Sequence, residues 1–183
     1  MIHRYLIENK LYFYATGTNE KAFLNSTWKM SQKEVEKANG AELFAPKNQF
    51  TCLPPGDFTN PLRFKALSSE QVSLWGLNAE VTYCFFDDIL YSYEISISEI
   101  KDDKLQEKIT ETLKNRFCEG EAISPKSAAM RLRHLWNLSN QMIEYAIIES
   151  DDKRFHNIFI KAQHKPLNEF IQQAARKERE SYF

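Results

Sequence analysis

The chain is poor in glycine, proline and cysteine. Its 183 residues include only five glycines, six prolines and three cysteines. Such low glycine and proline contents argue against a disordered or collagen-like chain. The cysteines are odd in number and form no C-x-x-C pair, so neither a disulfide framework nor a structural zinc site is expected. Cys84 is predicted to be a small core residue of a strand, and one disulfide that leaves a single free thiol stays open as an alternative.

An excess of charge of either sign is also missing, as is a long apolar run. The 24 basic and 25 acidic residues give a formal net charge of −1. Nucleic-acid binders usually carry a basic excess, because neutralising phosphates drives their affinity. We therefore expect no nucleic-acid partner. No stretch of about 18 apolar residues occurs, so no transmembrane segment is predicted.

The N-terminal segment differs from a secretory leader, because Glu8 and Lys10 stand where a leader has an apolar run. We therefore expect a cytoplasmic protein. If a leader has been removed, the alternative is a periplasmic or envelope protein.

Motifs of catalysis and metal binding are missing too. The sequence contains no G-x-S-x-G, no Walker loop, no G-x-G-x-x-G and no H-E-x-x-H, which are the patterns of hydrolases, phosphate loops, dinucleotide sites and zinc proteases. The pairs Asp87-Asp88 and Asp151-Asp152 are interpreted as turns, since aspartate tolerates turn conformations. His134 and His156 are expected two strands apart, about 9–10 Å, which is too far for a compact metal site. No metal, cofactor or catalytic residue is predicted.

Aromatic residues, by contrast, are abundant, with 13 phenylalanines, eight tyrosines and three tryptophans. Aromatic side chains favour β-sheet packing, and a chain of this length can bury roughly 70% of its unfolded surface. We expect a single domain over residues 1–183. A further hypothesis divides it into two similar halves, about 26–120 and 121–183, because each contains a run of strands followed by a helix.

Three helices are predicted from capping residues and periodicity. Ser31 and Glu34 match a capping box, and Asn39-Gly40 suits a left-handed helix end. A second helix over 102–118 carries an apolar residue at every fourth position. A third helix begins at Pro166, and its predicted inner stripe is Leu167, Phe170, Ile171 and Ala174.

Strands are predicted as an antiparallel meander over 62–98, followed by strands at 132–138, 142–149 and 154–162. The clearest strand is 89–98, where apolar residues alternate with serine and glutamate. Its predicted buried face carries Ile89, Tyr91, Tyr93, Ile95 and Ile97. The predicted fold class is therefore α+β, an antiparallel β-sheet of meanders with helices packed on one face.

A family resemblance rests on three short motifs. They are Trp28-x-Met30-Ser31-x-x-Glu34-Val35, the Asp87-Asp88 hairpin, and the helix that ends in Phe117-x-x-Gly120. Together they resemble small bacterial α+β proteins with a W-G-M-S-x-x-E-V opening, a group similar to the SmpA/OmlA lipoprotein family and the β-lactamase-inhibitor-like fold. The resemblance implies helices on one face of an antiparallel sheet and protein binding without catalysis. Lys29 stands where that group usually has glycine.

The sequence therefore favours a bacterial, non-catalytic module that binds another protein or a small ligand through its sheet or the loop at 41–61. Aromatic anchors dominate protein interfaces, and the predicted binding residues are Trp75, Phe50, Phe58 and Trp136. One alternative is an inhibitor or immunity-type protein with a concave acidic and aromatic sheet surface. The other is an enzyme whose site assembles from scattered residues: His134, His156, Glu144 and Asp57. Neither the partner nor the oligomeric state follows from the sequence.

Overall fold

The computed structural model describes residues 25–46, 63–69, 72–101, 103–117, 120–125, 129–150 and 154–180. The predicted Asp151-Asp152 turn and most of the loop at 41–61, with Phe50, Asp57 and Phe58, lie outside these residues.

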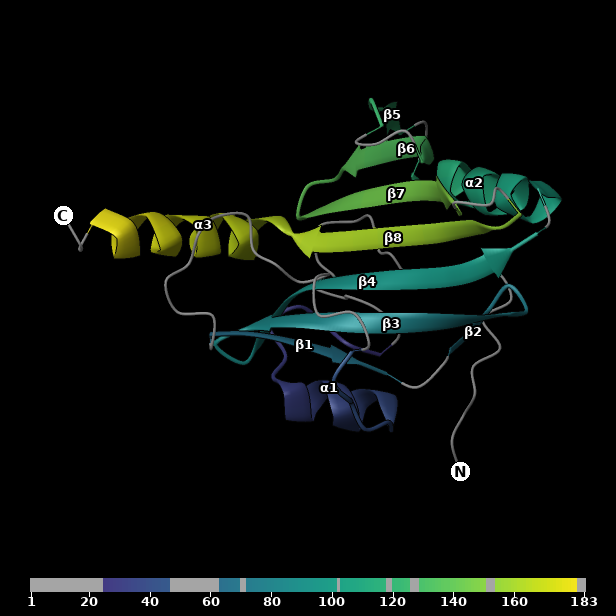
Figure 1. Cartoon of the computed structure of the whole chain (residues 1–183). Coiled ribbons are helices and arrows are strands. Elements are labelled where there is room, and N and C mark those ends of the chain that lie inside the picture. Colours follow the sequence, from purple (N-terminus) through teal and green to yellow (C-terminus); the bar gives the residue numbers. More distant parts are fainter. Residues whose placement is uncertain are drawn as a thin grey trace.

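One antiparallel sheet of eight strands forms the centre of the molecule (Figure 1). The strands are β1 (Phe64–Ser68), β2 (Val72–Leu74), β3 (Leu77–Phe86), β4 (Ile89–Ile100), β5 (Glu121–Ala122), β6 (Met130–Asn137), β7 (Gln141–Glu149) and β8 (His156–His164). The helices are α1 (Gln32–Asn39), α2 (Asp103–Phe117) and α3 (Lys165–Glu180). The predicted α+β class with an antiparallel sheet is confirmed.

Two sets of strands meet at the middle of the sheet. The order is β1-β3-β4-β8-β7-β6-β5, with β2 also paired to β3. The central pair, β4 and β8, sets Ile95 opposite Ile160 and Ile97 opposite Ile158. Three consecutive strands therefore precede α3, and a similar meander precedes α2. The division into two similar halves stays a prediction.

Helices α1 and α2 cover the same face of the sheet, which we call the first face. Val35 of α1 and Ile109 and Leu113 of α2 are fully buried. All three belong to one apolar cluster with Tyr93 and Ile95 of β4. The apolar periodicity predicted for the second helix is thus confirmed, because its stripe is the side that the sheet buries.

The alternation predicted for strand 89–98 is wrong at its beginning. Phe85 pairs with Leu90 whereas Cys84 pairs with Ser92, so Tyr91 is the extra residue of a β-bulge. A bulge shifts the pleat by one position, and Tyr91 therefore packs with Cys84 on the opposite, second face. Ile89 does not join the main core and is 38% exposed.

The third helix is the exception to the predicted packing on one face. Its Ile171 lies in the cluster of the second face with Cys84 and Tyr91, and Figure 1 shows α3 running outward past the end of β8. Ala175 is buried with Ile171, whereas Phe170 is 59% exposed. The inner stripe follows positions four residues apart, which leaves Phe170 outside it, contrary to the prediction.

Cys84 takes part in a disulfide bond, whose other sulfur lies outside the described residues. The residue is buried as predicted, and its disulfide is the alternative that the sequence left open. Burial on the second face and a covalent bond therefore both fix this end of β3.

The helix-capping motifs predicted at both ends of α1 are confirmed. The Ser31 and Glu34 side chains complete the capping box, and Gly40 ends α1 with a left-handed φ of 60°. Asp87 and Asp88 form the β3–β4 turn with φ of 48° and 63°, the pattern of a two-residue hairpin loop. The turn also does more than reverse the chain, because the Asp88 carboxylate accepts the Gln32 N–H at 3.1 Å.

Candidate functional site

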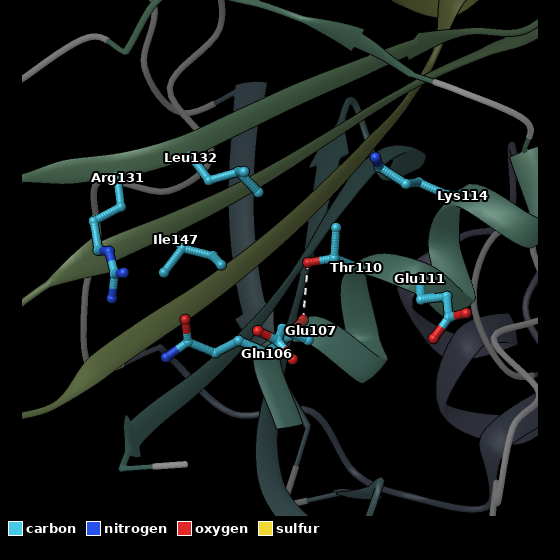
Figure 2. Close-up of a pocket in the computed structure, with 8 residues that line it drawn as sticks. All are labelled: Gln106, Glu107, Thr110, Glu111, Lys114, Arg131, Leu132 and Ile147. Atoms are coloured by element: carbon cyan, nitrogen blue, oxygen red, sulfur yellow. Dashed lines mark hydrogen bonds between the residues drawn. The ribbon is translucent and has the colours of Figure 1, made fainter. Parts of the chain in front are cut away.

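An open groove of about 630 Å³ lies between α2 and strands β6 and β7 on the first face (Figure 2). The i, i+4 stripe next to the buried apolar stripe of α2 forms one wall, so the sequence of the helix decides which polar groups face the groove. Leu132 and Ile147 lie side by side in the paired strands and form an apolar floor. The remaining lining residues are Gln106, Glu107, Thr110, Glu111, Lys114 and Arg131.

A chain of hydroxyl groups with fixed donor directions ties α2 to β7. The Thr110 hydroxyl lies 2.8 Å from the Gln106 carbonyl oxygen and 3.0 Å from the Tyr145 hydroxyl. A carbonyl oxygen can only accept, so Thr110 gives its single proton to Gln106 and accepts the proton of Tyr145. Burial raises the pKa of Tyr145 to about 12, which extends the range in which the phenol stays protonated further into alkaline pH. Thr110 is therefore a rigid part of the wall.

The Gln106 side chain is the least satisfied group in the groove. Gln106 is only 6% exposed, and its amide nitrogen Nε2 is buried without a hydrogen-bond partner among the described residues. A buried donor left unpaired costs about 1–3 kcal/mol. Because the Gln106 side chain lines the groove, a turn of its amide toward the groove would let an acceptor on a bound molecule remove that cost.

Arg131 stands at one end of the groove. It is skipped in the pairing of β6 with β7, where Met130 faces Ile148 and Leu132 faces Ile147. Its Nε lies 3.6 Å from the Glu149 carboxylate and its Nη1 lies 3.2 Å from His156 Nε2. The groove thus combines a guanidinium group, an unpaired amide donor and an aliphatic floor. Such a combination suits recognition of a polar group attached to an apolar body.

Trp136, one of the predicted binding residues, belongs to the core. It is 3% exposed, and its ring centroid lies 6.0 Å from that of Phe117. The alternation of β6 places Trp136 on the first face opposite Ile143, under α2. A partner that docks on the molecular surface would therefore not reach it.

Trp75 lies in the turn between β2 and β3. Its φ of 51° and the φ of 78° at Gly76 again fit a two-residue hairpin loop. The ring is half-buried against the main core, and its Nε1 has no hydrogen-bond partner in the described part of the chain. The binding role predicted for Trp75 stays a prediction, as do those of Phe50 and Phe58, which lie outside the described residues.

The structure does not bring together the residues predicted for a scattered catalytic site. His134 pairs with Tyr145 on the first face, whereas Glu144, next to Tyr145 in β7, points to the second face. His156 lies on the first face but at the Arg131 end of the sheet, and Asp57 is outside the described residues. Within the described ranges, no three histidine, cysteine, aspartate or glutamate side chains are grouped as a metal site would need.

Charged side chains cross the second face in one row. Glu94, Lys161 and Glu144 are consecutive cross-strand neighbours, and the Arg133 guanidinium lies 2.6 Å from the Glu144 carboxylate. Burial, reinforced by the nearby Glu144 and Glu80 and opposed by Lys161, raises the pKa of Glu94. Cross-strand pairs of opposite charge stabilise neighbouring strands, so we interpret this row of charged side chains as a structural feature of the sheet.

Sequence reasoning missed the residues of the groove. The polar stripe Gln106, Thr110 and Lys114 was visible in the sequence, since it runs at four-residue spacing beside a predicted apolar stripe. Polar residues in that position usually face solvent, however. They line a groove here only because α2 packs beside β6 and β7.

No protein-family model, no curated protein and no solved structure matches this chain. The similarity to the SmpA/OmlA group therefore stays a prediction. Among the described residues, no helix combines the length and the apolar character that crossing a bilayer requires.

Proposed function

We propose that the protein is a non-catalytic binding protein whose ligand or partner occupies the groove between α2 and β6–β7. The observation that carries this proposal is the buried Gln106 amide, whose nitrogen has no hydrogen-bond partner among the described residues although the side chain lines the groove. A residue that only stabilises the fold would not keep an unpaired buried donor, whereas a binding site often departs from the most stable choice.

The hydroxyl groups near the groove also support binding over catalysis. Thr110 is engaged both as a donor and as an acceptor, and Tyr145 is buried and protonated. Neither hydroxyl is poised as a nucleophile or as a base. The groups that face the groove are suited to hold a molecule in place.

Replacement of Gln106 by methionine tests the proposal. Methionine has a similar volume and no polar group, so Gln106→Met should remove the desolvation cost and raise the free energy of unfolding by about 1–2 kcal/mol. Thermal unfolding measures this as a rise of about 2–4 °C per kcal/mol. The matched control is Gln173→Met, at an exposed position of α3, which should leave the unfolding temperature unchanged.

A thermal-shift screen with small carboxylates, amines and short peptides completes the test. Ligands that raise the unfolding temperature of the wild-type chain should have little effect on Gln106→Met. A variant that is less stable than wild type would show that the amide has a structural role, and it would overturn the proposal.

A further inference from the structure

We propose that the groove binds a small aliphatic monocarboxylate, with its carboxylate between Gln106 and Arg131 and its apolar body over Leu132 and Ile147. This inference rests on the proposed function and names the ligand class for the same groove. It follows from the order of the donors, the charges and the apolar residues along the groove.

The head of the ligand is defined by two donors at one end. Figure 2 shows the Gln106 amide turned toward the end of the groove where Arg131 lies, away from Lys114. Within the described part of the chain, Nε2 has no acceptor, and a guanidinium group binds a planar carboxylate through paired hydrogen bonds. A carboxylate can accept hydrogen bonds from both groups, with Arg131 keeping its contacts to Glu149 and His156.

The net charge of the ligand is limited by the rim of the groove. Glu107 and Glu111 line the groove from the exposed side of α2. Glu149 already lies 3.6 Å from Arg131 and shares its positive charge. Three carboxylates near the site would repel a dianion such as a phosphate monoester more strongly than a single carboxylate.

The body of the ligand is defined by the floor. Leu132 is half-buried and Ile147 beside it is 5% exposed, and both line the groove with aliphatic side chains. The Thr110 hydroxyl, already donating to Gln106, offers the ligand no proton. Gln106 and Lys114 are eight residues apart on α2, or about 12 Å along the axis, which gives room for a short alkyl chain.

The test is calorimetric titration of sodium octanoate into the full chain and its variants. Arg131→Gln should weaken octanoate binding at least about tenfold, because a charged hydrogen bond contributes about 1.5–3 kcal/mol. Lys114→Gln removes the same charge from the opposite end and should change the affinity less than about threefold. Thermal unfolding of each variant confirms that it is folded, and Arg131→Lys, which keeps the charge without the planar fork, should give an intermediate loss.

Three probes with the same alkyl chain separate the ligand classes. Octanol and octylammonium should bind more weakly than octanoate, and so should octyl phosphate. The proposal is overturned if octanoate does not bind, if octyl phosphate or octylammonium binds as tightly, or if Lys114→Gln is as damaging as Arg131→Gln. If octanoate fails while Gln106→Met still stabilises the chain, the ligand class is wrong and the groove remains the proposed binding site.

Discussion

A side chain at position 120 would collide with the ring of Trp136. A Cβ atom built on Gly120 would lie 2.6 Å from Trp136 Cε2, well inside van der Waals contact. The indole is itself buried and packed on Phe117, so it has little freedom to move away. The sequence predicted Gly120 as the end of a helix, and the structure shows that it also makes room for the core.

Gly120→Ala should therefore destabilise the protein by about 1–3 kcal/mol, the usual cost of overpacking a core. Urea unfolding followed by tryptophan fluorescence measures the change. The control is to make the same substitution in the Trp136→Phe variant. The smaller ring leaves more room, so Gly120→Ala should destabilise this variant clearly less than it destabilises the wild type. An equal cost in both backgrounds would show that the collision with Trp136 is not the cause.

The hydrogen bond between Asp88 and Gln32 links two secondary-structure elements, since it joins the β3–β4 turn to the beginning of α1. The first N–H groups of a helix have no partner within the helix, and the Asp88 carboxylate supplies one across 56 positions of sequence. Arg63, the residue before β1, binds the neighbouring Asp87 and holds the pKa of that carboxyl below its usual value. The turn between β3 and β4 thus also contacts α1 and the residue before β1.

Replacement of Asp88 separates this tie from the conformation of the turn. Asp88→Gly tolerates the left-handed φ but removes the acceptor, so the Gln32 amide should exchange with solvent faster. The free energy of opening at this amide should fall by about 0.5–1 kcal/mol, the cost of a lost helix cap. Asp88→Asn keeps both the acceptor oxygen and the tolerance of positive φ, and it should show a smaller change. Native-state hydrogen exchange measures both variants. Unchanged exchange in Asp88→Gly would contradict the capping role.

Three buried tyrosines make the stability of the whole molecule depend on pH in the alkaline range. Tyr83, Tyr91 and Tyr145 are each at most 2% exposed, and burial raises the pKa of all three, that of Tyr145 to about 12. A raised pKa in the folded state means that folding favours the neutral phenol. The stability that this contributes is fully present below the unfolded pKa of about 10 and is lost as the pH rises toward the folded value.

We therefore expect the free energy of unfolding to fall between pH about 10 and about 12, with Tyr145 alone contributing up to about 3 kcal/mol. Urea midpoints measured across this range, together with the phenolate absorbance, test the expectation. Lysines also titrate there, so Tyr145→Phe is the control, and its stability should fall less steeply than that of wild type. Parallel curves for the two proteins would exclude a contribution from Tyr145.

Much of the fold could be predicted from local sequence signals. The capping box at Ser31, the turn at Asp87-Asp88 and the apolar stripe of α2 each depend on residues a few positions apart, so their physics is complete within one segment. The position of Tyr91 could not be predicted this way. A β-bulge depends on how two strands pair, and one skipped residue moves a side chain to the other face.

Local sequence signals were enough to predict the fold class, the ends of α1 and the helical stripe that the sheet buries, because propensity and periodicity act within short segments. Tertiary structure alone decided that α3 packs against the second face, that Trp136 is buried, and that His134 and Glu144 point to opposite faces. It also decided the candidate site, since Gln106 on a helix and Arg131 on a strand line one groove only when α2 lies across the paired strands. Contacts between distant segments follow from packing, and no short window of sequence contains both partners.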